Sequence, residues 1–240
     1  MTTTRNRHLY ELAIGGHGFP RIADSEIENS FARGRDGVDV VSERSIYRYG
    51  LGHGDRPVVI WRAAYANSHI HKPGQLDAGS GTTPAILPGG YTAITDNADP
   101  MDVVVYRTAV RLRRGRRRLV CRVPVFHAGA GDTENSLIAD GRSLIVENNY
   151  GYAGYADPDA NAQTRPGFAR VDIGRDAHGC HRVWQTDSLA APSVVPKLSL
   201  KTVPTGEGTL DNNNHASLSL GPAGNAYLAT IGGITELRRR

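Results

Sequence analysis

The chain has 240 residues, and its 28 Lys and Arg against 24 Asp and Glu give a formal net charge of +4. Hydrophobic residues make up 39% of it, and 28 Gly and 13 Pro favour many short elements joined by turns over long helices. No stretch approaches the ~20 apolar residues of a membrane span, and residues 1–10 lack the apolar segment of a signal peptide.

The chain repeats one unit of four short apolar runs separated by glycine-containing turns. Each unit opens with a polar residue before a short apolar run and closes with a strand that often contains Trp. The openings lie about 50 residues apart, which is close to the period of propeller repeats. The units cover 29–65, 83–127 and 135–187, and they open with NSFA at Asn29, TPAIL at Thr83 and NSLI at Asn135.

Four strands per unit at this period predict a β-propeller blade. One twisted four-stranded sheet cannot bury both of its faces, so each blade has to pack against its neighbours around a ring. Trp61 and Trp184 occupy matching closing strands and are expected to wedge between blades. The sequence therefore predicts an all-β fold, a propeller of four-stranded antiparallel blades that forms a single domain over 1–240.

The repeat loses its register after the third unit. The fourth unit, 193–240, contains two openings, at Ser193 and at Asn214, which lie too close together to enclose a whole blade. It also ends without a closing strand, which the strand expected at 9–14 would supply. The prediction is four to five blades, near the lower limit of about four for propellers, so a closed ring and an incomplete, internally deleted ring both remain open.

Much of the positive charge is concentrated around Gly115, between two apolar strand-like runs. This position predicts the solvent-exposed tip of a hairpin. A surface that follows phosphates more often spreads its basic residues along a face and interleaves aromatic residues, so no nucleic-acid partner is expected. The cluster consists of Arg111, Arg113, Arg114, Arg116, Arg117 and Arg118.

The two cysteines, Cys121 and Cys180, are too far apart in sequence for a CxxC metal or redox motif. They form either a buried free pair or one disulfide between neighbouring units. The disulfide is favoured because each cysteine lies near the start of a predicted outer strand, and it would require an oxidising compartment.

The third unit contains Ala169, Asp172, Gly179 and Trp184, a spacing that resembles the tryptophan-docking pattern of quinoprotein (PQQ) dehydrogenase-like propellers. The resemblance implies a propeller fold. Those dehydrogenases place a pair of adjacent cysteines against the cofactor, and this chain has no such pair, which argues against quinone chemistry.

Several longer segments resemble an uncharacterised group of bacterial propeller proteins that are generally exported and have no established activity. The resemblance covers most of 28–237 and departs at 193–214, where such proteins would have a further blade. It implies exported relatives, and it leaves the function open. The segments are GTTPAIL, AITDNADPMDVVVYR, TENSLI, VENNYGY and SVVPKLSL.

A candidate metal site follows from the geometry of a propeller. The opening residue of each innermost strand faces the central channel, where amide oxygens and carboxylates suit a hard cation such as Ca²⁺. Propeller lactonases of the paraoxonase type use a similar ring, which makes metal-assisted hydrolysis the alternative function. Asn and Ser at strand starts also satisfy backbone groups at turns. The candidate ligands are Asn29, Glu134, Asn135 and Asn214, with Glu28 beside them.

A second candidate site lies in the loops that follow the second strand of neighbouring units. Loops at corresponding edges lie on one face of a propeller, so these residues are expected to form the mouth of a binding site, with Tyr152 and Tyr155 as flat contact surfaces. Asn-Asp-Pro runs are equally ordinary turn formers. The mouth residues are Asp96, Asn97, Asp99, Glu147, Asn148, Asn149 and Tyr150.

No nucleophile elbow or phosphate-binding glycine loop is present. His69 and His71 have no partner at zinc-binding spacing and are predicted to be exposed loop residues. The leading hypothesis is therefore a propeller that binds a small molecule or a protein partner, with a Ca²⁺-dependent, lactonase-like hydrolase as the alternative.

Overall fold

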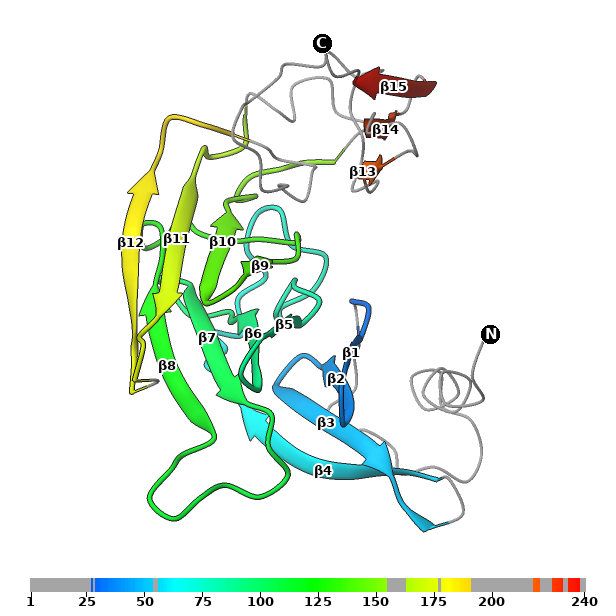
Figure 1. The fold of residues 1–240 in the computed structure, drawn as a ribbon. Helices are drawn as coiled ribbons and strands as arrows, with labels where there is room; N and C mark the ends of the chain where they lie inside the picture. Colours follow the sequence, from blue (N-terminus) through cyan, green and yellow to red (C-terminus); the bar gives the residue numbers. More distant parts are fainter. Residues whose placement is uncertain are drawn as a thin grey trace.

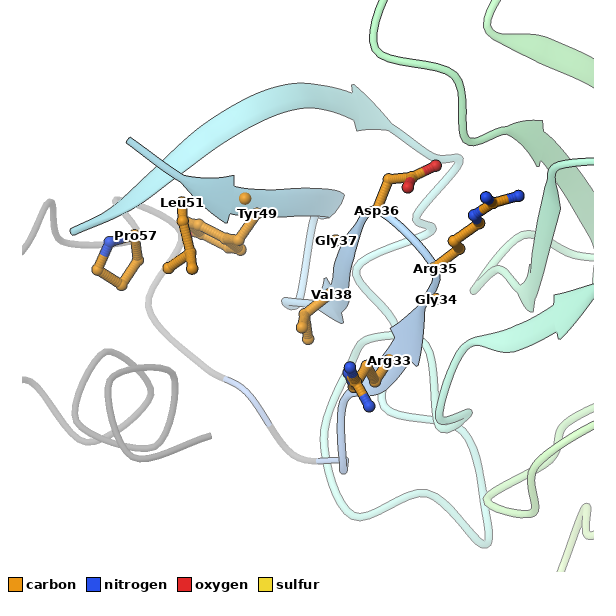
Figure 2. A pocket seen from close by; sticks show the side chains of 10 residues that line it. Arg33, Gly34, Arg35, Asp36, Gly37, Val38, Tyr49, Leu51 and Pro57 are labelled. Atoms are coloured by element: carbon orange, nitrogen blue, oxygen red, sulfur yellow. The ribbon is translucent and has the colours of Figure 1, made fainter. Parts of the chain in front are cut away.

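The computed structural model describes residues 27, 29–53, 56–154, 163–176 and 178–190, together with three strands between 218 and 237. The strands of the described residues form three four-stranded antiparallel sheets and one three-stranded sheet (Figure 1). Their bounds are β1 Ala32–Gly34, β2 Gly37–Val41, β3 Ser45–Leu51, β4 Pro57–Ala64, β5 Ala85–Leu87, β6 Tyr91–Thr95, β7 Asp102–Arg107, β8 Leu119–Pro124, β9 Ile138–Asp140, β10 Ser143–Glu147, β11 Phe168–Ile173, β12 Cys180–Thr186, β13 Leu218–Leu220, β14 Ala226–Thr230 and β15 Gly233–Leu237.

Each four-stranded sheet is a blade whose strands follow one another in chain order: blade 1 (β1–β4), blade 2 (β5–β8) and blade 3 (β9–β12). The short first strands are neighbours, because β5 contacts both β1 and β9, while the outermost strands β8 and β12 contact each other. Figure 1 shows the blades along an arc with β1, β5 and β9 on its inner side. The predicted all-β, propeller-like fold of four-stranded blades is confirmed.

Blade 2 is buried on both faces, which explains its long apolar strands. Three consecutive valines of β7 are fully buried. Val104 packs against blade 1 in a cluster with Ile46, whereas Val103 and Val105 pack against blade 3 in a cluster with Leu144. Successive side chains of a strand point to opposite faces, so an unbroken apolar run is what a sheet covered on both sides requires.

Glycines set the tight hairpin at the start of blade 2. Gly89 and Gly90, between β5 and β6, have φ angles of +83° and +81°. Because Leu87 pairs with Tyr91, the connection is only three residues long, and glycine adopts positive φ at two of its positions without steric cost.

The connections divide the molecule into two ends, named as Figure 1 draws them. The lower end holds the connections that follow β1, β3, β5, β7, β9 and β11. The upper end holds the connections that follow β2, β4, β6, β8 and β10, of which 65–84 and 125–137 are long. Blades related by rotation about one axis place equivalent connections at the same end.

Cys121 and Cys180 form a disulfide between the outermost strands of blades 2 and 3, with their Cα atoms 5.8 Å apart. Both lie near the start of their strands and pack against the core that these blades share. The disulfide favoured by the sequence is thus present, and it adds a covalent link to the packing and the hydrogen bonds between the two sheets, such as that from Arg182 Nη1 to the Pro124 carbonyl at 3.3 Å.

Trp61 and Trp184 differ in exposure, although their matching positions predicted that both would wedge between blades. Trp61 is 7% exposed and packs between blades 1 and 2, whereas Trp184 is 41% exposed. The prediction of a wedge is therefore wrong for Trp184. The reason is that only one face of blade 3, with Ala169 and Val171, packs against blade 2.

The C-terminal part contributes the three-stranded sheet β13-β14-β15. The segments 9–14 and 193–217, which were predicted to complete the last blade, lie outside the described residues. The assignment of 1–240 to a single domain stays a prediction. Among the described residues, no helix has the length and apolar character needed to cross a membrane.

Candidate functional site

The most heavily braced part of the upper end is the connection between β4 and β5, residues 65–84, called the strap loop here. Lys72 is buried in it, and its Nζ donates hydrogen bonds to the carbonyl oxygens of Ala98 at 2.6 Å and Gly131 at 3.2 Å. These carbonyls belong to two other upper-end loops. One buried lysine therefore ties the strap loop to both.

The buried side-chain amides of Gln75 and Asn97 form further hydrogen bonds to the strap loop. Gln75 Nε2 donates to Asn97 Oδ1 at 3.0 Å, and Gln75 Oε1 accepts from the Lys72 N–H at 2.7 Å. Asn97 Nδ2 in turn donates to the Ile70 carbonyl at 3.1 Å. The Gly151 N–H donates to the Pro73 carbonyl at 2.7 Å, which joins the strap loop to the loop after β10. The strap loop is thus fixed along its length.

The charge of Lys72 is compensated only in part. Burial lowers the pKa of Lys72, while the carboxylates of Asp132, Asp99 and Asp96 act in the opposite direction. The amine is enclosed by backbone carbonyls and shielded from solvent. We therefore assign it a structural role in holding the loops together.

The strap loop exposes large apolar side chains in spite of this bracing. Ile70 is 58% exposed and Leu76 is 76% exposed. His69 and His71 are exposed beside Ile70, as the sequence predicted, and His69 has a φ of +57°. A positive φ in a residue other than glycine persists only where the surrounding structure holds it.

Most of the predicted mouth residues lie beneath this surface. Asp96, Asn97, Glu147, Asn148 and Asn149 are buried, Tyr150 is half-buried, and Asp99 is exposed. The structure therefore brings these residues together at one end, with five of them in the interior.

The buried members of this group bond to backbone groups of the loops. Asp96 Oδ1 accepts from the N–H groups of Ala98 at 3.1 Å and Asp102 at 2.8 Å. Asn148 Oδ1 accepts from the N–H groups of Asp132 and Tyr150, both at 3.1 Å. These bonds are of the kind that the turn-forming interpretation of the same residues implies.

Burial of Asp96 also changes its protonation. Desolvation raises the pKa of Asp96 to about 6, although the two backbone N–H groups that it accepts from favour the ionised form. Asp96 is therefore a buried carboxyl that gains its charge only near neutral pH.

The predicted metal ligands that the structure describes lie just before two of the innermost strands. Asn29 precedes β1 and is half-buried, whereas Glu134 and Asn135 precede β9. Asn135 is buried, and its Nδ2 donates to Glu147 Oε1 and, at 3.1 Å, to Asn149 Oδ1. Asn214 and Glu28 lie outside the described residues.

Glu147 is the buried carboxyl at the centre of this group. Burial raises its pKa well above the ordinary value, and hydrogen bonds from Asn135 and Asn149 oppose the shift. Glu134 is close to this group, because its N–H donates to Asn149 Oδ1 at 2.9 Å. Its side chain lies against Gly81, where an added Cβ would be 2.5 Å from Glu134 Oε1. In the described part of the chain, no three His, Cys, Asp or Glu side chains come together as a metal-binding group.

The strap loop is the feature that the sequence analysis did not identify. Its sequence signals are a Pro73-Gly74 turn and two apolar residues, Ile70 and Leu76, in an otherwise polar segment. Nothing in these signals specifies that Lys72 bonds to carbonyls 26 and 59 residues away.

No family model matches the chain, and no curated protein matches it. Among solved structures, it is similar to one described as the structure of a Mycobacterium tuberculosis puromycin-hydrolyzing peptidase, with 20% sequence identity and a TM-score of 0.35. The similarity covers 83% of this chain and 24% of that one, so the chain spans about a quarter of the peptidase's length. A similarity at this level supports no inference about activity.

Proposed function

We propose that this protein is a binding scaffold that presents the strap loop to a protein partner. The observation behind the proposal is that Ile70 and Leu76 are exposed on a loop fixed by buried hydrogen bonds. Single exposed apolar residues are common, but two of them on one braced loop form a compact site for a partner to cover.

The bracing favours binding because an ordered loop loses little conformational entropy when a partner docks. Lys72, Gln75 and Asn97 hold the strap loop from beneath. Asp99 and Tyr150 lie at the surface in the neighbouring loops and would supply polar contacts at the rim of the site. In this proposal, the buried members of the predicted mouth support the binding surface.

The experiment replaces both apolar side chains of the strap loop with Asp, as Ile70→Asp with Leu76→Asp. The matched control replaces exposed apolar residues elsewhere, as Val58→Asp with Leu189→Asp. Tagged proteins are incubated with extract of the native cells, and the retained proteins are quantified by mass spectrometry. We expect a partner to be retained by the wild type and by the control. Its retained amount should fall at least about tenfold for the strap-loop variant, since each apolar side chain buried in an interface contributes about 1.5–3 kcal/mol.

Equal retention by all three proteins would contradict the proposal. The melting temperature of each variant is measured beside that of the wild type, because these side chains are exposed and their replacement is expected to leave folding intact.

A Ca²⁺ site in the central channel is the second candidate, and Glu147 is the observation that favours it. Its Oε2 is buried and accepts no hydrogen bond from the described residues, and a bound cation would compensate for this. The ligands proposed from the sequence are Asn29, Glu134, Asn135 and Asn214, to which this observation adds Glu147, with lactone hydrolysis as the reaction class.

The melting temperature in Ca²⁺, Mg²⁺ and Mn²⁺ tests this candidate. A cation at about 100 times its Kd stabilises the folded protein by about 2.7 kcal/mol, so a rise with Ca²⁺ that is lost in Asn135→Ala is expected. An unchanged melting temperature in all three cations would remove this candidate and leave the partner-binding proposal untouched.

The relation to quinoprotein-like propellers is proposed at the level of fold alone. Ala169 of the resembling pattern is buried against blade 2, and Asp172 accepts a hydrogen bond from Arg170 at 2.8 Å. Trp184 of the same pattern is exposed. Absorbance spectroscopy of the purified protein tests the chemistry, and we expect no quinone band.

A further inference from the structure

The connection between β7 and β8, residues 108–118, is called the arginine loop here. Figure 1 shows it as a long loop that extends beyond the sheets at the lower end. At its tip, Gly115 has a φ of +80°, and a Cβ added there would meet no atom within 4 Å. The exposed arginines of the loop are Arg111, Arg113, Arg114, Arg116 and Arg117.

Two further arginines hold the base of the loop in place. Arg107 Nη1 donates to the Arg117 carbonyl, and Arg118 Nη1 donates to the carbonyl of Ala109, each at 2.6 Å. The Arg118 guanidinium also lies over the ring of Trp61, 4.5 Å from its centroid. The loop is therefore anchored to the blades, and only the exposed arginines are available to a partner.

The positive charge of the loop is not neutralised within the described part of the chain, where no carboxylate forms an ion pair with the five exposed arginines. The nearest turn adds Arg175, which is exposed, and His178, whose Nε2 lies 3.2 Å from Arg116 Nη1. One carboxylate, Asp176, lies in the same turn, and its pKa is lowered first by the His178 N–H and only weakly by Arg116.

The upper end has the opposite character. The loops there contain six acidic residues, Glu43, Asp77, Asp96, Asp99, Asp132 and Glu134, against three basic ones, Arg44, Lys72 and Arg165. The described molecule thus has an acidic end and a basic end. A charge separation of this kind orients a protein toward an anionic surface at its basic end.

Apolar side chains accompany the arginines. Val110 is 56% exposed within the loop, and Leu119 is exposed where the loop enters β8. The loop contains no aromatic residue on which a base would stack. Arginines bind phosphate groups in a bidentate manner, and apolar residues beside them enter the boundary between lipid headgroups and acyl chains. The disulfide at this end also favours an oxidising compartment, such as the extracellular space or the periplasm.

We propose that the lower end of the propeller docks on an anionic phospholipid surface through the arginine loop, with the exposed arginines on lipid phosphates and Val110 at the acyl boundary. This site lies at the opposite end from the strap loop and does not depend on the function proposed for it. The protein is thereby oriented with the strap loop away from the lipid.

The experiment measures co-sedimentation of the full chain with vesicles of phosphatidylcholine alone and of phosphatidylcholine mixed with phosphatidylglycerol. The test variant is Arg113→Gln with Arg114→Gln and Arg117→Gln. The control, Arg44→Gln with Arg165→Gln and Arg182→Gln, removes the same charge from exposed positions outside the arginine loop. We expect binding only to the mixed vesicles, a loss of about a hundredfold in the test variant, and a much smaller loss in the control. Val110→Ser, which keeps every charge, is expected to weaken binding severalfold.

Equal binding to both vesicle types, or equal losses in the test variant and the control, would overturn the proposal. Binding of duplex DNA is measured with the same variants. Binding of DNA that depends on the arginine loop, without binding of the mixed vesicles, would assign the loop to nucleic acid instead. A melting curve for each variant confirms that it is folded, and the Val110→Ser result tests the proposal without altering the arginines.

Discussion

The two interfaces of blade 2 are built on the same strands but differ in the polar and covalent groups beside their apolar clusters. Toward blade 1, the cluster is accompanied by a buried ion pair within blade 1, in which Arg48 Nη1 of β3 donates to both carboxylate oxygens of Asp39 of β2, at 2.8 and 3.0 Å. Toward blade 3, the cluster is larger and is closed by the disulfide of Cys121 and Cys180. The difference teaches that two faces of one blade can be buried with different polar and covalent groups beside their apolar clusters.

The ion pair is more sensitive to substitution than the disulfide, because removing one partner leaves the other buried without an opposite charge. Gly34 and Gly37 leave room for the Arg48 side chain, since a Cβ at either position would meet it at 2.8–3.0 Å. Desolvation raises the pKa of Asp39 in spite of Arg48, which shows how completely this carboxyl is buried. The disulfide, by contrast, acts mainly by restricting the unfolded chain.

The largest effect is expected from Arg48→Met, which leaves the Asp39 carboxyl buried without its ion-pair partner. We expect a loss of about 3–5 kcal/mol in the free energy of unfolding, measured by urea denaturation. Asp39→Leu combined with Arg48→Met removes both charges and should recover most of the loss. If the double variant is no more stable than Arg48→Met, the ion pair is not the reason for the instability.

Reduction of the disulfide tests the other interface. Cys121→Ser with Cys180→Ser is expected to cost about 2–4 kcal/mol, because it frees a loop of about 60 residues in the unfolded state. The same loss should follow when the wild type is denatured in the presence of a reductant. The variant itself should be unaffected by reductant, and a further loss in it would point to another cause.

Asp96→Asn sharpens the comparison at the upper end, where the loop after β6 adjoins both interfaces. The pKa of Asp96 is raised to about 6 from an ordinary 3.8. The folded protein therefore holds a proton that the unfolded chain releases, and stability falls as the pH rises from about 4 to about 6. Asp96→Asn keeps the Oδ1 acceptor and removes the charge. We expect it to gain roughly 3 kcal/mol at most at pH 8 and nothing at pH 4, and a gain independent of pH would contradict this account.

The smallest effect is expected from Trp184→Ala, which should cost less than about 1 kcal/mol because 41% of its surface is exposed. Trp61→Ala at the matching position should cost about 3–5 kcal/mol, since Trp61 packs between blades and its Nε1 donates to the Thr108 carbonyl at 3.3 Å. Melting curves of the two variants make the comparison directly. Similar losses would mean that blade 3 buries its second face after all.

The fold was predictable because its signals are local. The runs that became β2, β6 and β10, and the glycines between them, recur at a fixed period, and burial on both faces requires the apolar residues that the strands contain. The position of both cysteines near strand starts likewise favoured the bond that the structure shows. The exposure of Trp184 was not predictable, since it depends on what packs against the second face of blade 3.

The candidate sites were predictable only as a location. The run Asp96-Asn97 and the run Glu147-Asn148-Asn149 were expected at corresponding ends of neighbouring blades, and they lie where β6 and β10 end. Their burial was not foreseen, because Asn and Asp have the same turn signal whether they face solvent or bond to a neighbouring loop. The strap loop was missed for the same reason, since Lys72 reads as an ordinary surface residue.

The sequence by itself determined the strands, the turns and the four-stranded repeat, because these depend on residues that are close together along the chain. Only the tertiary structure decided which polar side chains became internal braces and which apolar ones stayed exposed. That decision depends on contacts between blades, such as those of Lys72 with the carbonyls of Ala98 and Gly131, which join segments distant in sequence. Burial is a property of the assembled sheets, and no single segment contains it.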